Sequence, residues 1–227
     1  MAVTARTPVE VKETARLCQA AGVKAYHTTA DSTRAAEVRA ALVKITRALG
    51  APSVLVNNAG IARSEAFLKT DEALMGLHWQ LNVMGAFYAS QAVLPGMLKQ
   101  KWGRVVNIAS VAGKVGAPYI AAYAASKHGL LGLTRSMAAE FAHTGITVNA
   151  VCPGYVDTML TKENIGVISQ KTGMSKAEAK KRLEAMSPQG RLTSPEEVAV
   201  VVAFLCSRAA GNINGQALTI DGGALQW

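Results

Sequence analysis

Short apolar runs that alternate with longer amphipathic segments are the feature that most constrains the fold of this chain. The runs are rich in β-branched residues, and the segments between them carry apolar residues at helical spacing. This alternation is typical of βαβ units, which build a parallel sheet covered by helices on both faces. We therefore expect one doubly wound α/β domain over residues 1–227, a length sufficient for a core of its own.

The expected elements follow this alternation along the chain. Strands are expected at Ala2–Ala5, Val23–Thr28, Val54–Asn57, Arg104–Ala109, Ile146–Val151 and Ala217–Ile220. Helices are expected at Pro8–Ala21, Arg34–Leu49, Asp71–Met97, Ala121–Thr144 and Pro195–Ser207. Thr7 and Ser194 each precede a proline and stand three residues before a glutamate, which predicts capping boxes at two helix starts.

The stretch from about residue 160 to 191 departs from this pattern. It is polar and rich in lysine, and a helix is expected around Lys176–Met186. An insertion of this kind before the last helix and strand predicts a helical substrate lid rather than a second domain. Its basic residues either meet the phosphates of an acyl carrier or form a solvated helix face.

Composition excludes several classes of protein. No stretch approaches the roughly 18 to 20 apolar residues that cross a bilayer, and no signal-peptide pattern is present, so a cytoplasmic protein without a membrane partner is expected. The three cysteines lack metal-ligand spacing, which favours buried reduced thiols and predicts no metal site. The net charge of +9 comes from scattered Lys and Arg, which favours a solvated basic surface over nucleic-acid binding.

Three residues carry the strongest chemical signal. Tyr123 and Lys127 are four positions apart on an expected helix and share a face, and Ser110 follows an expected strand. Carboxyl ends of strands line the ligand crevice of open α/β sheets. An adjacent ammonium favours a phenolate, so we expect Lys127 to lower the Tyr123 pKa. Tyr123 would then exchange a proton with a substrate oxygen that Ser110 hydrogen-bonds.

The sequence resembles the short-chain dehydrogenase/reductase family over essentially its whole length, because several motifs occur in the order and with the spacing that the family shows. They are Asn57-Asn58-Ala59-Gly60, Asn82, Ser110, Tyr123 with Lys127, Pro153-Gly154-Tyr155-Val156-Asp157-Thr158 and Asp221-Gly222-Gly223. The resemblance implies an NAD(P)-binding Rossmann sheet. It also implies a catalytic site of Ser110, Tyr123, Lys127 and Asn82, in which the Asn82 carbonyl holds a relay water.

The resemblance further implies a set of cofactor contacts. These residues are Arg6, Asp31, Asn58, Ala59, Gly60, Tyr123, Lys127, Pro153, Gly154, Val156 and Thr158. Within that set, Asp31 would contact the adenine, Lys127 the ribose and Thr158 the carboxamide of the nicotinamide. Two other amides, Asn57 and Asn149, either contact the cofactor or simply brace the sheet.

The opening strand and Gly-rich turn of the family have no counterpart here. The first glycine is Gly22, and Ala2–Ala5 followed by Arg6 is similar to the family's second strand. A mispredicted start, a fragment and a genuine truncation all fit this pattern. We expect Ala2–Ala5 to stay unpaired with Val54–Asn57, leaving open strand edges. Arg6 favours NADP (NADPH) as the cofactor, with NAD possible, because arginine at this place commonly faces the 2′-phosphate.

Among family members, the sequence is most similar to reductases of β-ketoacyl carrier-protein or CoA thioesters and to bacterial polyketide ketoreductases. We therefore expect NADPH-dependent reduction of a small-molecule or carrier-bound ketone, first a 3-oxoacyl thioester, by a homodimer or homotetramer. The segment Ile61-Ala62-Arg63-Ser64-Glu65 replaces the Pro-Gly-Gly of aromatic polyketide ketoreductases and weighs against that assignment. The alternatives are a generic alcohol or sugar dehydrogenase and a non-catalytic remnant that oligomerises but binds cofactor poorly.

Overall fold

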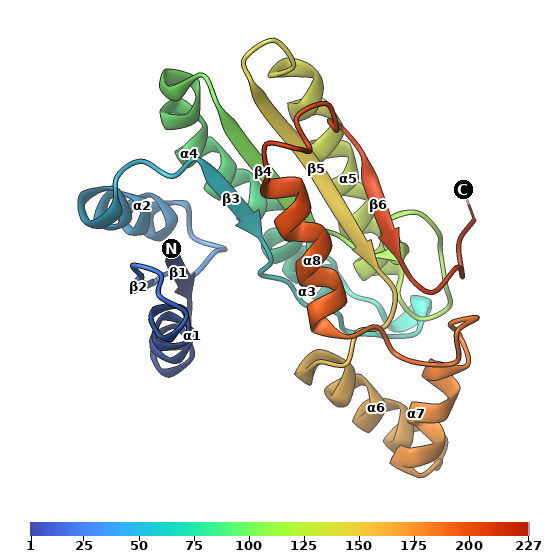
Figure 1. Ribbon diagram of the computed structural model, residues 1–227. Coiled ribbons are helices and arrows are strands. Elements are labelled where there is room, and N and C mark those ends of the chain that lie inside the picture. Colours follow the sequence, from blue (N-terminus) through green and yellow to red (C-terminus); the bar gives the residue numbers. More distant parts are fainter. Residues whose placement is uncertain (227) are drawn as a thin grey trace.

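Six parallel strands in two separate sheets organise the fold of the computed structural model, which describes residues 1–226 (Figure 1). The strands of the four-stranded sheet, in spatial order, are β3 (Val54–Asn57), β4 (Gly103–Ile108), β5 (Ile146–Pro153) and β6 (Ala217–Ile220). The strands of the two-stranded sheet are β1 (Ala2–Ala5) and β2 (Tyr26–Thr29). The α/β class with a parallel sheet is confirmed.

Helices occupy most of the chain between the strands. They are α1 (Pro8–Ala20), α2 (Ala35–Leu49), α3 (Glu72–Trp79), α4 (Gly85–Gln100), α5 (Ala121–Glu140), α6 (Met159–Thr172), α7 (Lys176–Glu184) and α8 (Pro195–Cys206). Figure 1 shows α4 and α5 on one face of the four-stranded sheet and α8 on the other. Helices on both faces explain why the residues of β4 and β5 are buried almost throughout.

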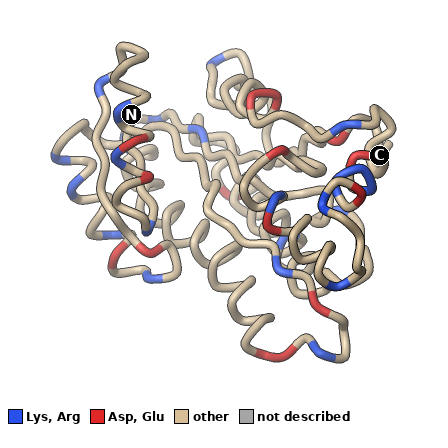
Figure 2. The backbone as a smooth tube through the Cα atoms, turned by 90° about the horizontal axis from the view of Figure 1, so that it is seen from below, with Lys and Arg blue, Asp and Glu red and all other residues tan. Residues whose placement is uncertain are grey.

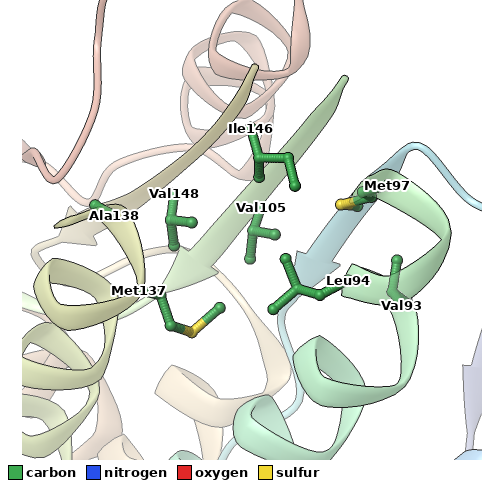
Figure 3. Packing of buried hydrophobic residues seen from close by; sticks show 8 residues of the cluster. All are labelled: Val93, Leu94, Met97, Val105, Met137, Ala138, Ile146 and Val148. Atoms are coloured by element: carbon green, nitrogen blue, oxygen red, sulfur yellow. The ribbon is translucent and has the colours of Figure 1, made fainter. Parts of the chain in front are cut away.

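The core lies between the central strands and these helices. On the α4–α5 face, side chains from both helices interlock with those of β4 and β5 (Figure 3). They are Val93, Leu94, Met97, Val105, Met137, Ala138, Ile146 and Val148. A second cluster on the opposite face includes Val106, Val151 and Leu205. Every residue of β5 is buried, so this strand is the rigid centre of the sheet.

No backbone pairing joins β1 to β3 within residues 1–226, as the sequence predicted. We call this feature the β1–β3 break. On its β3 side, Val54 and Val56 are 38% and 40% exposed. Helix packing holds the two sheets in place instead, because Leu42 of α2 packs against the core on α4. Gln80 Nε2 also donates a 2.8 Å hydrogen bond to the carbonyl oxygen of Thr33.

The predicted element boundaries differ from the structure by at most four residues, and the single helix expected at Asp71–Met97 is α3, a π-helical segment and α4 in succession. The strand expected at Val23–Thr28 begins only at Tyr26, because Gly22 ends the preceding helix with a φ of 79° and a short connection follows it. The helix expected to reach Thr144 ends at Glu140 and is followed by a turn. Neither shift changes the order of the elements.

The two predicted helix starts behave differently. Ser194 caps α8 with the complete capping box, in which Glu197 accepts from the Ser194 amide. At α1, the Thr7 side chain makes no capping hydrogen bond, so the second predicted capping box is wrong. Thr7 and Glu10 are both exposed, and water can therefore satisfy the first amides of this helix.

The insertion before α8 forms a helical pair, α6 and α7, below the carboxyl edge of the sheet in Figure 1. Its own small cluster includes Ile165, Ala179, Leu183 and Leu192. The expected helix around Lys176–Met186 is therefore present but ends at Glu184. Figure 2 shows Lys and Arg spread along the backbone with Asp and Glu between them.

Candidate active site

Ser110, Tyr123 and Lys127 lie together at the carboxyl end of β4. Lys127 Nζ donates a 2.8 Å hydrogen bond to the carbonyl oxygen of Ile108, the last residue of that strand. The same nitrogen lies 5.8 Å from the centroid of the Tyr123 ring. The Ser110 side chain hydrogen-bonds Tyr123 and also accepts from the Ala112 amide at 3.1 Å. The structure thus brings together the three residues that the sequence predicted to converge.

Asn82 ties the loop after β3 to α5. It lies in a π-helical segment, Gln80–Met84, between α3 and α4. Its buried side chain accepts from the Ile61 amide at 2.9 Å and donates to Ser126 Oγ at 2.9 Å. Ser126 Oγ donates in turn to the Tyr123 carbonyl at 2.7 Å. A π-helical turn interrupts the regular backbone hydrogen bonds of a helix and is frequent at functional sites. The relay water on the Asn82 carbonyl stays a prediction.

Gly60 brings the backbone of the same loop close to Lys127. A methyl group in place of its hydrogen would lie 3.0 Å from Asn82 Oδ1 and 3.6 Å from Lys127 Nζ. Gly60 is exposed, as are its neighbours Asn58 and Ala59. The space beside the ammonium therefore exists because this position has no side chain.

Burial is the largest cause of the pKa shifts of Lys127 and Tyr123. It lowers the pKa of Lys127 to about 8. It also raises the pKa of Tyr123, while the hydrogen bond with Ser110 acts against this increase. Tyr155 and Cys152 raise the Tyr123 pKa further. The predicted lowering of the Tyr123 pKa by Lys127 is therefore wrong for this structure, because desolvation of the phenolate outweighs the nearby ammonium.

The predicted contacts after β5 lie at the same edge of the sheet. Pro153 ends β5, and the Gly154 amide donates to the Ile220 carbonyl at 2.9 Å. Val156 forms an isolated bridge with Thr193, and Thr158 begins α6 without capping it through its side chain. These four residues therefore lead from the central strand into α6, and the role of α6 and α7 as a substrate lid stays a prediction. The Thr158 hydroxyl lies 3.5 Å from the Val156 carbonyl oxygen.

Arg6 and Asp31 lie across the β1–β3 break from the Tyr123 site. They follow β1 and β2, so both stand at the carboxyl edge of the two-stranded sheet. Asp31 Oδ1 accepts from the amide and the hydroxyl of Thr33, at 2.9 and 2.7 Å. These hydrogen bonds lower the Asp31 pKa most, with Arg6 and Arg34 adding to the effect. Asp31 thus already braces a local turn.

Two amides whose role the sequence left open are braces. Asn57 Nδ2 donates to Asn107 Oδ1 at 2.8 Å and joins β3 to β4. Asn149 Nδ2 donates to the Ile213 carbonyl at 2.7 Å, and its Oδ1 accepts from Gln216 at 3.0 Å. Both amides are therefore committed to the sheet and the loop before β6.

Sequence reasoning missed three residues that surround Tyr123. Ser126 links its backbone to Asn82, and the His78 ring packs against its ring. Cys152 is buried beside Ser110, whereas Cys18 and Cys206 are only half-buried, so the expectation of three buried thiols holds for one. His78 was detectable only by its position one helical turn before Asn82, which places both on one face.

The described part of the chain contains no cluster of three His, Cys, Asp or Glu side chains that could hold a metal ion. Its helices likewise include none with the length and apolarity that crossing a membrane requires.

Comparison with known proteins places the chain among oxidoreductases. A family model described as enoyl-(acyl carrier protein) reductase matches residues 1–224. The 3-oxoacyl-(acyl-carrier-protein) reductase of Pseudomonas aeruginosa is 37% identical over 222 residues, which is 97% of this chain and 85% of the relative. A protein of Xanthobacter autotrophicus named inactive 2-(S)-hydroxypropyl-CoM dehydrogenase is 41% identical over 203 residues, covering 89% and 86%.

A solved structure shows the same fold. A tryptophan variant of actinorhodin polyketide ketoreductase, determined with NADPH, is 38% identical and has a TM-score of 0.96. The match covers 100% of this chain and 87% of that one. The chain therefore belongs to the short-chain dehydrogenase/reductase family, as its motifs indicated.

The buried ammonium of Lys127 predicts a distinct dependence of stability on pH. In the folded protein Lys127 loses its proton near pH 8, whereas its ordinary value is 10.5, so the unfolded chain binds more protons between these limits. The free energy of unfolding of the wild type, relative to Lys127→Met, should rise by up to about 3 kcal/mol across this window. Urea titrations of both proteins at pH 7.5 and 10.5 measure the difference, and a pH-independent difference would contradict the assignment.

Proposed function

We propose that this protein reduces a ketone, first of all a 3-oxoacyl thioester, to a secondary alcohol with NADPH as the hydride donor. The observation that carries the proposal is the joint placement of Ser110, Tyr123 and Lys127 at the carboxyl end of β4, where Lys127 bonds the Ile108 carbonyl. The names of the Pseudomonas relative and of the actinorhodin enzyme support a ketoacyl substrate.

The residues around Lys127 fit the nicotinamide and ribose end of such a cofactor. Gly60 leaves beside the ammonium a space that a Cβ would fill. An ammonium has three N–H donors, so one bond to Ile108 leaves others for ribose hydroxyls. Thr158, whose hydroxyl does not cap α6, can reach a carboxamide. NADPH, when bound, supplies the hydride to the carbonyl carbon.

The proton side of the reaction falls to Tyr123. Its raised pKa keeps the phenol protonated near neutral pH, which suits a group that donates a proton to the developing alkoxide. Ser110 Oγ accepts from the Ala112 amide, which fixes the oxygen. Its own proton, which faces Tyr123 here, would be donated to the carbonyl oxygen of the bound substrate. Lys127, with a pKa of about 8, can replace the proton that Tyr123 gives up.

The pyrophosphate is the part of the cofactor with least support in residues 1–226. The described residues include no Gly-rich turn of the family's kind, and no pairing joins β1 to β3. A second candidate function is a non-catalytic assembly subunit, because one relative, 41% identical to this chain, is named inactive. We expect the polypeptide 1–227 to bind NADPH orders of magnitude more weakly than micromolar. A fluorescence titration giving a low-micromolar Kd would contradict this expectation.

The substitution Tyr123→Phe tests the proposed proton donor. It removes the hydroxyl but keeps the ring, so ketone reduction should fall to below a few per cent while the NADPH dissociation constant stays nearly unchanged. Lys127→Ala should weaken both, because it removes the ribose contact as well. NADPH oxidation with acetoacetyl-CoA at saturating cofactor measures the rate. A Tyr123→Phe protein that keeps more than a few per cent of the rate would rule out Tyr123 in this role.

A further inference from the structure

The loop that follows β3 is hydrogen-bonded at every second residue to three different parts of the fold. In each of these hydrogen bonds, a backbone N–H group of the loop is the donor. The three bonds run from Ile61 to Asn82 Oδ1 at 2.9 Å, from Arg63 to His78 Nε2 at 3.1 Å and from Glu65 to the Tyr119 carbonyl at 2.8 Å. The bond from Arg63 differs from the other two because its acceptor, a histidine ring nitrogen, belongs to a class of side chain that titrates near neutral pH.

The two bonds of the His78 ring fix its protonation state. Nδ1 lies 2.9 Å from the Leu74 carbonyl oxygen, which can only accept, so Nδ1 carries the proton. Nε2 faces the Arg63 amide, which can only donate, so Nε2 must be unprotonated. His78 is fully buried, and its neutral Nδ1–H tautomer is the only form that satisfies both partners.

The same ring forms a wall of the Tyr123 site. The His78 and Tyr123 rings meet edge to face, with centroids 6.1 Å apart and an interplanar angle of 65°. This is a favourable aromatic geometry and restricts how the phenol can tilt. One side chain on α3 therefore touches both the proposed proton donor and the backbone of the loop that carries Gly60.

The charged groups that face His78 oppose its protonation. They are Arg63 on the loop and Lys127 on α5. Burial is the largest cause that lowers the His78 pKa below its ordinary 6.5, these two charges lower it further, and the hydrogen bond with the Leu74 carbonyl acts against them. Tyr123, also on α5, is neutral near pH 7. A proton added to Nε2 would turn an acceptor into a donor pointed at the Arg63 N–H, and the hydrogen bond would break.

We propose that neutral His78 is a positioning residue, which holds the Ile61–Glu65 loop and the Tyr123 ring in one arrangement, and that protonation of Nε2 releases the loop. The catalytic consequence rests on the proposed reductase function. The link between His78 and Arg63 does not, because it is a property of the folded chain alone.

Two substitutions separate the two contacts of the ring. His78→Gln retains an acceptor that can reach the Arg63 amide but cannot titrate. His78→Phe retains the ring edge against Tyr123 but leaves the Arg63 N–H without its acceptor, which should lower kcat/KM for ketone reduction about tenfold at pH 7. His78→Gln should stay within about threefold of the wild type at that pH.

The pH profile is the readout that a merely structural role would not change. Wild-type kcat/KM should fall toward acid pH with a midpoint below 6.5, the ordinary His value, and His78→Gln should lack this decline. An acid limb that persists unchanged in His78→Gln would overturn the proposal.

A second measurement needs no substrate and no cofactor. In ¹⁵N-labelled wild type, the His78 ring should show the Nδ1–H tautomer at pH 7, and the Arg63 amide resonance should shift with the same midpoint as the ring. An Nε2–H tautomer, or an Arg63 amide resonance that does not shift as His78 titrates, would overturn the proposal. If instead the wild type reduces no ketone at any pH, the proposed function fails while this experiment still decides the His78–Arg63 link.

Discussion

The hydrogen bond from the buried Lys127 ammonium to the Ile108 carbonyl is the constraint on which the rest of the site depends. It fixes α5 against the carboxyl end of β4 and requires close packing on every side. A methyl group on Gly113 would lie 2.9 Å from the Lys127 carbonyl, and one on Gly60 would approach its ammonium. Tyr123 lies one helical turn before Lys127 on α5, so the placement of this helix also places Tyr123.

The second organising feature is the division of the strands into two sheets. Ser110 follows a strand of the four-stranded sheet, and Tyr123 and Lys127 lie on α5, which packs against that sheet. Arg6 and Asp31 instead follow the strands of the two-stranded sheet. Packing of α2 on α4 joins the halves where strand pairing does not. The residues proposed for proton transfer are therefore placed independently of those expected to recognise the adenine end of a dinucleotide.

Much of this arrangement was predictable from the sequence, because it depends on local patterns. Alternating apolar runs gave the order of the strands, and the four-residue spacing placed Tyr123 and Lys127 on one helix face. Strand β2 was misplaced at its start, since only pairing with Met1–Ala5 decides where it begins. The unpaired edges of β1 and β3 followed from the missing counterpart of the family's opening strand.

Features that depend on contacts between distant segments were not predictable. The pKa of Tyr123 moves upward rather than downward because the folded chain buries the phenol, with Tyr155 and Cys152 adding to the increase, and no sequence spacing reveals that burial. His78 acquires its role from Arg63 and Tyr123, which are fifteen and forty-five residues away. Likewise, only the fold shows that Asn57 braces β4 rather than facing the cofactor side.

We propose that Ser110, Tyr123 and Lys127 together form a proton-donating and carbonyl-binding centre for a ketone that NADPH reduces. The most direct test of this proposal is deuterium transfer under saturating cofactor. The purified chain is incubated with acetoacetyl-CoA and millimolar NADPH deuterated at either C4 position, and the alcohol is analysed by mass spectrometry. We predict one deuterium at the carbinol carbon from a single C4 isotopomer. No transfer of deuterium at a cofactor concentration that saturates binding would contradict it.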